Sequence, residues 1–296
     1  MNKIEFINLT NKKKWRNSIN SNEINPGQTW EYSKFEQLNT KLPTVLLKLT
    51  FAKKTLFCPF HFKKMKTYSN IYTLRGFSGF NENLDYLEIK FLKNELEKFK
   101  IKKVYFTSNP YLEKEPKLNQ FSKFKSSVYL VDLSRKTDEI FKSFSNNLKR
   151  NLKKIEQRNE ISTSYQSKIS YNLIQPLYKT NLKRISLKAN KLYSYDSLRF
   201  LLKNKNNLII KSKSKNKIVA VSIFILTKYN AYYLTHFSTK DYNFLSGKHI
   251  FEAIKILKGK NIKLLNLGGL VKDKPGVEKF KLQFKPKICN LFEYRW

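Results

Sequence analysis

The pattern of hydrophobic and polar positions repeats once along the chain. Segments 70–108 and 230–269 each contain an apolar run, an amphipathic stretch and a second apolar run, in that order. Upstream of each segment, at 45–62 and 208–225, two apolar runs flank a lysine-bearing turn. Short apolar runs predict strands, and apolar residues at helical spacing predict a helix. Each half therefore predicts strand, turn, strand, strand, amphipathic helix and strand.

The two segments also match at individual positions. Tyr72 aligns with Tyr232, and Phe91 aligns with Phe251. The apolar faces of the two predicted helices comprise Leu84, Leu87, Phe91 and Leu92 in the first half, and Ile250, Phe251, Ile254 and Leu257 in the second. Matched element order and matched residues together predict a duplicated α/β unit.

The halves are joined by a predicted strand at 128–133 and a predicted helix that follows it. Thr137 is the expected N-cap of this helix, because Asp138 and Glu139 then occupy its first turn. One apolar stripe runs along the helix: Ile140, Phe141, Phe144, Leu148, Leu152 and Ile155. Most of the lysines on its other faces are expected to be solvated, and a further helix is predicted at about 170–203.

These elements predict three parts of the chain. The first unit spans 1–135, and the second unit, with the linking helices, spans 136–288. Residues 289–296 form a terminal strand that returns to the first unit.

The net charge of +37, from 59 basic and 22 acidic residues, indicates a polyanionic partner. Nucleic acid, a phosphorylated precursor and an anionic membrane face all fit this charge. A coding bias toward lysine and asparagine is the alternative explanation for part of the excess.

The cysteines and the apolar runs restrict the class of protein. Cys58 and Cys289 lie far apart without metal-ligand spacing, so we expect no zinc site and no disulfide framework. The longest apolar run, "IVAVSIFIL", is about half of what a membrane span needs, and the amino-terminal segment lacks a signal-peptide core. We therefore expect a cytoplasmic protein without a transmembrane segment.

Three motifs resemble the FemAB-type peptidoglycan bridge transferases. They are "QTWEY" (28–32), the linking segment "VDLSRKTDEIFKSFSNNLKRNLKKIEQRNEIS" and the closing "NLGGLVKDKPGVEKFKLQF". The resemblance implies an α/β (α+β) fold of two tandem GNAT-like units, each a mixed, largely antiparallel sheet flanked by helices. It also implies transfer of an aminoacyl group from aminoacyl-tRNA to an amine of a nucleotide- or lipid-linked envelope precursor. Relatives with this fold instead use acyl-CoA and acylate amino sugars.

The resemblance also assigns roles to residues. The "FK" pair of the closing motif places Lys281, with Phe280 beside it, at the reaction centre, where a fixed positive charge would stabilise a tetrahedral oxyanion. The alternative is that Phe280 packs in the core and Lys281 is solvated, on a short helix that begins at Gly276. Arg184 and Lys34 lie near the basic positions that the family uses for the phosphates of its precursor.

Further candidates lie on the strands expected to border the cleft. Gly268 and Gly269 end the strand "IKLLNL", where backbone can approach a substrate or simply turn before Pro275. Asn266 interrupts the same apolar strand and faces either the cleft or a neighbouring side chain. His236 is a candidate proton acceptor or a structural histidine, and Tyr233 a candidate substrate contact or a packing residue.

The sequence therefore predicts an N-acyl- or aminoacyltransferase that acts on a cell-envelope precursor, peptidoglycan or surface polysaccharide, with peripheral contact to an anionic membrane. No permanently bound cofactor and no metal are expected, and the donor is aminoacyl-tRNA or acyl-CoA. The glycine-rich pyrophosphate loop typical of acyl-CoA-dependent GNAT enzymes is missing, which favours tRNA. The alternatives are an acyl-CoA-dependent amino-sugar N-acyltransferase and a non-catalytic RNA-binding protein on a decayed transferase fold.

Overall fold

The computed structural model describes residues 2–19, 25–74, 79–112, 122–184, 192–269 and 275–295. The chain divides into two compact units, the first comprising 1–128 together with 289–296, and the second comprising 129–288. Strand β6 (Ser122–Asp132) passes from the first unit into the second, and β12 (Lys287–Arg295) passes back.

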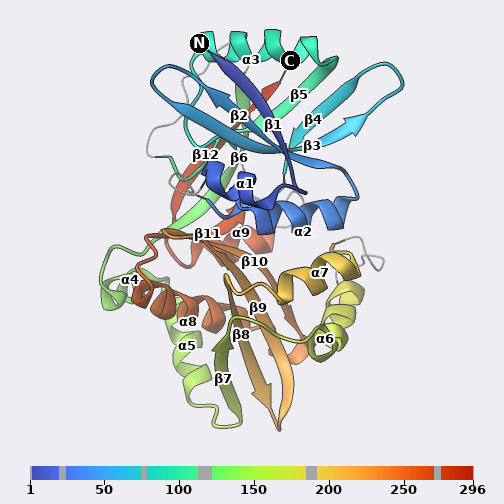
Figure 1. The fold of residues 1–296 in the computed structure, drawn as a ribbon. Helices are drawn as coiled ribbons and strands as arrows, with labels where there is room; N and C mark the ends of the chain where they lie inside the picture. Colours follow the sequence, from blue (N-terminus) through green and yellow to red (C-terminus); the bar gives the residue numbers. More distant parts are fainter. Residues whose placement is uncertain are drawn as a thin grey trace. The chain divides into compact units, whose positions relative to one another are not determined.

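The first unit contains a mixed sheet with helices on both faces (Figure 1). Its strand order is β1-β2-β3-β4-β5-β12. Its other elements are β1 (Lys3–Asn8), α1 (Lys12–Ile19), the 3-10 helix η1 (Pro26–Gln28), α2 (Trp30–Thr40), β2 (Thr44–Thr50), β3 (Thr55–Lys64), β4 (Ser69–Thr73), α3 (Tyr86–Lys98) and β5 (Ile101–Thr107).

Alternation along the strands gives this sheet two apolar faces. Leu47 and Cys58 pack in the cluster that includes the inner face of α3. Their neighbours Leu46 and Phe57 pack in the opposite cluster, with Trp15 of α1. Helix α3 begins at a capping box, in which Asp85 accepts a hydrogen bond from the Glu88 amide and the Glu88 side chain accepts one from the Asp85 amide.

The second unit has strand order β6-β11-β10-β9-β8-β7. Its elements after β6 are α4 (Thr137–Ser143), α5 (Asn146–Glu156), β7 (Ile161–Gln166), α6 (Tyr171–Arg184), α7 (Tyr195–Leu202), β8 (Asn207–Ser214), β9 (Lys217–Leu226), β10 (Asn230–Ser238), the 3-10 helix η2 (Lys240–Tyr242), α8 (Leu245–Gly259), β11 (Leu264–Gly269) and α9 (Pro275–Leu282). Helices α4, α5 and α8 lie on one side of the sheet and α6 and α7 on the other (Figure 1).

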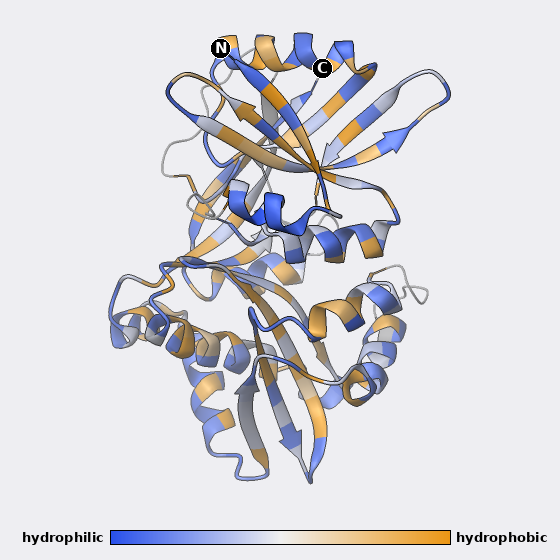
Figure 2. Ribbon diagram, in the orientation of Figure 1, coloured by the Kyte–Doolittle hydropathy of each residue, from blue (hydrophilic) through white to orange (hydrophobic). Residues whose placement is uncertain are grey.

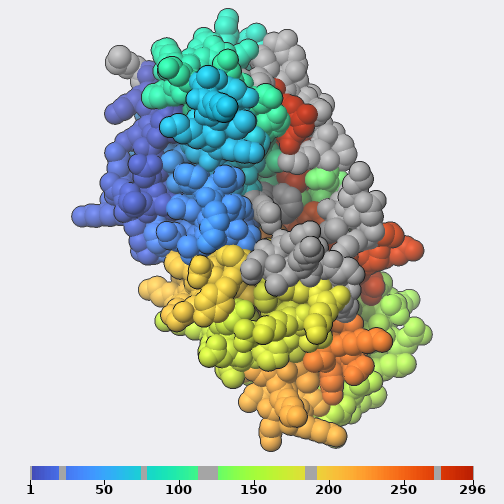
Figure 3. All heavy atoms as spheres, turned by 90° about the vertical axis from the view of Figure 1, so that its right-hand side faces the viewer, coloured from blue at the N-terminus to red at the C-terminus, as the bar shows by residue number. Residues whose placement is uncertain are grey.

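The core of the second unit lies mainly between α8 and the sheet. Strand β9 is strongly hydrophobic, and most of its residues are buried (Figure 2). Phe224 packs with Ile250 and Ile254 of α8 in one cluster. On the opposite side, α6 and α7 are in contact with each other and lie side by side on the surface in Figure 3.

The predicted repeat is present in the two sheets, so the predicted two-unit α/β fold is confirmed. In the first unit β2–β3 and β3–β4 pair antiparallel and β4–β5 pair parallel. In the second unit β8–β9 and β9–β10 pair antiparallel and β10–β11 pair parallel. Tyr72 of β4 pairs with Tyr105, and the matching Tyr232 of β10 pairs with Asn266.

The structure corrects three local predictions. The single helix expected after strand 128–133 is two helices, because the chain leaves helical geometry at Phe144 and Ser145 then caps α5 by accepting a hydrogen bond from the Leu148 amide. The N-cap position of α4 is Lys136, so Thr137 is already the first helical residue. Leu87, expected on the apolar face of α3, is 73% exposed.

Candidate functional site

Lys281 is a buried cation at the carboxyl end of β11. It lies on α9, its residue is only 7% exposed, and its Nζ donates a hydrogen bond of 2.6 Å to the Gly269 carbonyl oxygen. Burial lowers the pKa of Lys281 to about 8, and the nearby Glu278 carboxylate opposes this shift only in part. The alternative of a solvated Lys281 therefore does not apply.

Gly268 makes the approach of Lys281 to the backbone possible. Its φ is +84°, a conformation that other residues rarely adopt. A Cβ at this position would lie 3.3 Å from Nζ of Lys281 and 3.9 Å from Cε2 of Tyr232. The chain therefore needs glycine here both for its backbone angle and for the space that Lys281 occupies.

Asn266 fixes the turn at the end of the same strand. Its Oδ1 accepts a hydrogen bond of 2.7 Å from the Gly268 amide, and the residue is completely buried. Within the described parts of the chain, its Nδ2 has no hydrogen-bond partner. A buried amide donor without a partner is unfavourable, so this group is available to a bound carbonyl or a water molecule.

Tyr129 and Glu278 complete the surroundings of Lys281, and sequence reasoning missed both. Nζ of Lys281 lies 5.7 Å from the centre of the Tyr129 ring, within the range of a cation–π interaction. The Tyr129 hydroxyl donates a hydrogen bond of 2.7 Å to Glu278 Oε1, and burial together with this bond raises the pKa of Tyr129 to about 12. The spacing of Glu278 and Lys281, three residues apart on one helix, was the available signal.

Phe280 is half-buried against the core and lies beside a pocket of about 290 Å³. Its ring meets that of Phe284 edge-to-face at 5.5 Å. The pocket is at the start of α8, and Gly247, Lys248 and Gln283 are among its lining residues. Gly247 allows α5 to pack closely, because a Cβ there would lie 3.1 Å from Cδ1 of Leu148.

His236 and Tyr233 of β10 face α8 and belong to a polar network. The Ser222 hydroxyl lies 2.8 Å from Nδ1 of His236 and 3.0 Å from Nδ1 of His249. Tyr233 also hydrogen-bonds Ser222, and its burial raises its pKa well above the usual value. Beyond the pair Tyr232–Asn266, β10 continues without further pairing to the described part of β11.

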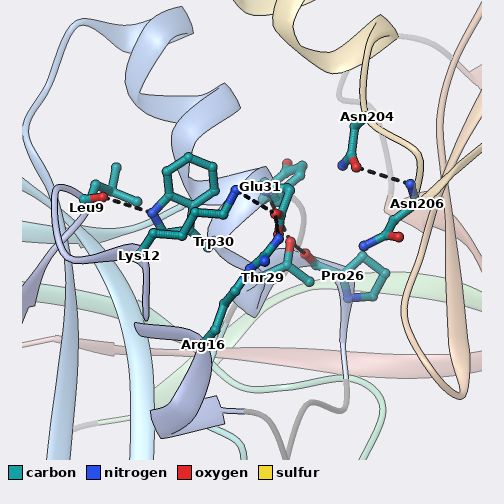
Figure 4. A network of polar contacts seen from close by, with 10 residues as sticks. Leu9, Lys12, Arg16, Pro26, Thr29, Trp30, Glu31, Asn204 and Asn206 are labelled. Carbon is teal, nitrogen blue, oxygen red and sulfur yellow. Dashed lines mark hydrogen bonds and ion pairs between the residues drawn. The ribbon is translucent and has the colours of Figure 1, made fainter. Parts of the chain in front are cut away.

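The two predicted phosphate-binding residues belong to other helices. Lys34 is a half-buried residue of α2 in the first unit, and Arg184 is the last residue of α6 in the second. The start of α2 is held by Trp30, which donates a hydrogen bond of 2.8 Å to the Leu9 carbonyl oxygen (Figure 4). Glu31 forms ion pairs with Lys12 and Arg16 in the same network.

A basic hollow of about 540 Å³ lies on α5 in the second unit. Its cationic lining residues are Lys149, Arg150, Lys153 and Lys154. None of the described residues that line it is acidic.

The described part of the chain contains no group of three or more His, Cys, Asp or Glu side chains placed to hold a metal ion. None of its helices combines the length and the apolar character needed to cross a bilayer.

Comparison with solved structures agrees with this architecture. The chain is similar to FemX, with a TM-score of 0.70 and 13% identity, over 99% of this chain and 97% of that one. It is also similar to L-PGS from Bacillus licheniformis (TM-score 0.60, 13% identity, 95% and 91% covered). A third similar structure is a conserved protein from Bacteroides thetaiotaomicron VPI-5482 (TM-score 0.64, 9% identity, 100% and 99% covered).

No protein-family model and no curated protein matches the sequence. At these identities the likeness concerns the fold, and at that level the resemblance to the FemAB-type proteins is confirmed.

Proposed function

We propose that the protein is an N-acyltransferase that forms an amide on a primary amine of a cell-envelope precursor, with aminoacyl-tRNA as the donor. The observation that carries this proposal is the buried cation of Lys281, held against the end of β11 by Gly268 and Gly269. A positive charge held in a desolvated position suits a reaction in which negative charge develops on an oxygen.

The reaction would place the donor carbonyl beside Lys281. An uncharged amine attacks the carbonyl carbon, and the carbonyl oxygen becomes an oxyanion that the ammonium group stabilises. Nδ2 of Asn266 supplies a second donor in the same region. Collapse of the intermediate forms the amide and releases the ribose hydroxyl of the tRNA, which receives one proton.

The charge distribution supports a tRNA donor. The basic hollow on α5 offers a phosphate backbone four cations within two turns of helix. Since aminoacyl-tRNA is made in the cytoplasm, the proposal places the reaction there. Lys34 and Arg184 remain our candidates for the phosphates of a nucleotide- or lipid-linked acceptor, and contact with an anionic membrane would follow from a lipid-linked one.

The pocket at the start of α8 supports acyl-CoA as a second candidate donor. The first turn of α8 contains no acidic residue, and Lys248 lies in this turn and lines the pocket. The amino-terminal end of a helix and a lysine together favour a phosphate group. The acceptor would then be an amino sugar.

The test compares Lys281→Gln with Lys279→Gln, an exposed lysine of the same helix. Transfer of a radiolabelled acyl group from charged tRNA or acetyl-CoA to a UDP-linked muropeptide or an amino sugar is measured. Loss of an oxyanion stabiliser predicts a rate about 100- to 1000-fold lower for Lys281→Gln, with Lys279→Gln near wild type. Equal rates for wild type and Lys281→Gln would remove the role of Lys281.

A thermal-shift panel of tRNA, acetyl-CoA and UDP-linked muropeptide separates the donors. Stabilisation by acetyl-CoA alone would exclude the tRNA-dependent reaction. Binding of tRNA without any acyl transfer would instead favour a non-catalytic RNA-binding protein.

A further inference from the structure

A continuous line of hydrogen bonds crosses the second unit from β7 to β10. It comprises Thr163–Ser212, Ser212–His249, His249–Ser222 and Ser222–His236, with distances of 2.8, 2.9, 3.0 and 2.8 Å. Every member can both donate and accept a hydrogen bond. Ser212, Ser222 and His249 are completely buried, whereas Thr163 and His236 at the two ends are half-buried.

The backbone of β10 is irregular where His236 joins this line of hydrogen bonds. A β-bulge between Tyr233 and Thr235 shifts the register of β10 against β9. Tyr233 and His236 both face α8 as a result, although strict alternation would place His236 on the other side of the sheet. Phe237 then faces Tyr178 of α6, with ring centres 5.3 Å apart.

These polar groups lie at positions where apolar residues would pack well. Ser212 follows Ile210 on the inner face of β8, and Ser222 precedes Phe224 on the inner face of β9. His249 precedes Ile250, which is part of the apolar core. Buried hydroxyl and imidazole groups contribute less than aliphatic side chains would, so their alignment indicates a function other than packing.

We propose that Thr163, Ser212, His249, Ser222 and His236 form a proton relay between the reaction site and solvent. This inference rests on the proposed function, because an amine that enters as an ammonium ion must release one proton to become a nucleophile. Nε2 of His236 is itself shielded from water, so a proton taken up there needs an internal path. Thr163, on the edge strand β7, provides the exit.

Each step of the relay breaks and forms one bond to hydrogen. Nε2 of His236 takes the ammonium proton, and its Nδ1 passes a proton to Ser222 Oγ. The Ser222 hydroxyl passes its own proton to Nδ1 of His249, whose Nε2 passes one to Ser212. Ser212 passes a proton to Thr163, which releases one to water. One proton enters, one leaves, and both imidazoles end neutral as the opposite tautomer.

The surroundings of His249 favour its neutral form. The titratable and charged groups that face His249 are His236 from β10, Lys248 from its own helix and Tyr233 across Ser222. Burial, and then the charges of His236 and Lys248, hold the pKa of His249 well below its usual value. His249 therefore passes a proton on in the same step in which it accepts one, because an imidazolium at this position is disfavoured.

The first test reads the tautomers by ¹⁵N NMR of the full chain without substrate. The chain has three histidines, and His61 of the first unit is the reference. An aligned relay requires opposite tautomers, one of His236 and His249 protonated at Nδ1 and the other at Nε2. Ser212→Ala should change the signals of both. Identical tautomers in wild type would place two donors or two acceptors on Ser222 and would overturn the relay.

The second test is kinetic. Ser212→Ala interrupts the relay between His249 and Thr163 without touching His236. We therefore expect kcat to fall about 10- to 100-fold while KM stays nearly unchanged, and we expect Ser212→Thr to restore kcat. Ser214→Ala is the matched control, because Ser214 is a buried residue of β8 whose hydroxyl bonds Tyr242 instead. Wild-type kcat in Ser212→Ala would overturn the relay. If wild type transfers no acyl group, the proposed function fails, and the tautomers alone decide the relay.

Discussion

Replacing Lys281 by methionine should make the second unit more stable while it removes activity. Methionine keeps an unbranched side chain of similar length but carries no charge. The Gly269 carbonyl oxygen loses its bond to Nζ, but Gly269 is half-exposed, so water can take the place of the lysine. The dominant change is removal of a charge from a buried position.

The size of this stability gain follows from the pKa of Lys281. Its decrease from 10.5 to about 8 means that the folded state disfavours the charged form of Lys281 by about 3 kcal/mol. Below pH 8 Lys281 is protonated in both states, so the wild type carries the full penalty. Between about pH 8 and 10.5 the unfolded chain binds more protons than the folded one, and wild-type stability rises with pH.

The assay is urea unfolding of both proteins at pH 7 and at pH 10, followed by circular dichroism. All three tryptophans belong to the first unit, so fluorescence provides an internal reference and limited proteolysis identifies the transition of the second unit. We expect the free energy of unfolding of Lys281→Met to exceed that of the wild type by up to about 3 kcal/mol at pH 7. This difference should shrink toward pH 10. Lys279→Met should change little. A Lys281→Met protein less stable than wild type at pH 7 would refute this reasoning.

Two further substitutions test the surroundings of Lys281. Gly268→Ala forces a Cβ into a left-handed conformation and against Nζ of Lys281, so unfolding free energy should fall by about 1–2 kcal/mol in a urea titration. Gly276→Ala is the control, because a Cβ at this helical position would have no other atom within 4 Å. This change should leave stability unchanged or increase it, and a loss of stability as large as that of Gly268→Ala would contradict the steric argument. Tyr129→Phe removes the bond to Glu278 but keeps the ring over Lys281, and should lower stability by about 1 kcal/mol. Tyr129→Leu also removes the cation–π contact, and equal effects of the two changes would exclude a contribution of the ring.

The sequence predicted the sheets because both halves repeat one hydrophobic pattern. Tyr72 and Tyr232 were aligned by that pattern alone, and both lie where a parallel strand pair forms. The break between α4 and α5 was missed because the apolar stripe continues through Phe144, and only the capping bond of Ser145 interrupts the helix. Helical periodicity carries no information about such a bond.

The surroundings of Lys281 were only partly accessible to sequence reasoning. Gly268 and Gly269 stood out because glycine is rare in this chain. Tyr129 lies in an ordinary apolar strand and reaches Glu278 only through the tertiary fold, 149 positions away along the chain. The line from Thr163 to His236 similarly joins four strands and a helix, and no local pattern marks it.

The discontinuity of the first unit has a consequence for biosynthesis. Its strand β12 pairs with β5 through Glu293, Tyr294 and Arg295, and the Tyr294 ring stacks on Phe106 at 4.6 Å. The second unit is one continuous stretch, 129–288, and is fully translated before this strand emerges from the ribosome. The sheet of the first unit must therefore wait for β12, and until then the Tyr294 ring that stacks on Phe106 is missing. A chaperone that covers this sheet edge during translation would act on the first unit and not on the second.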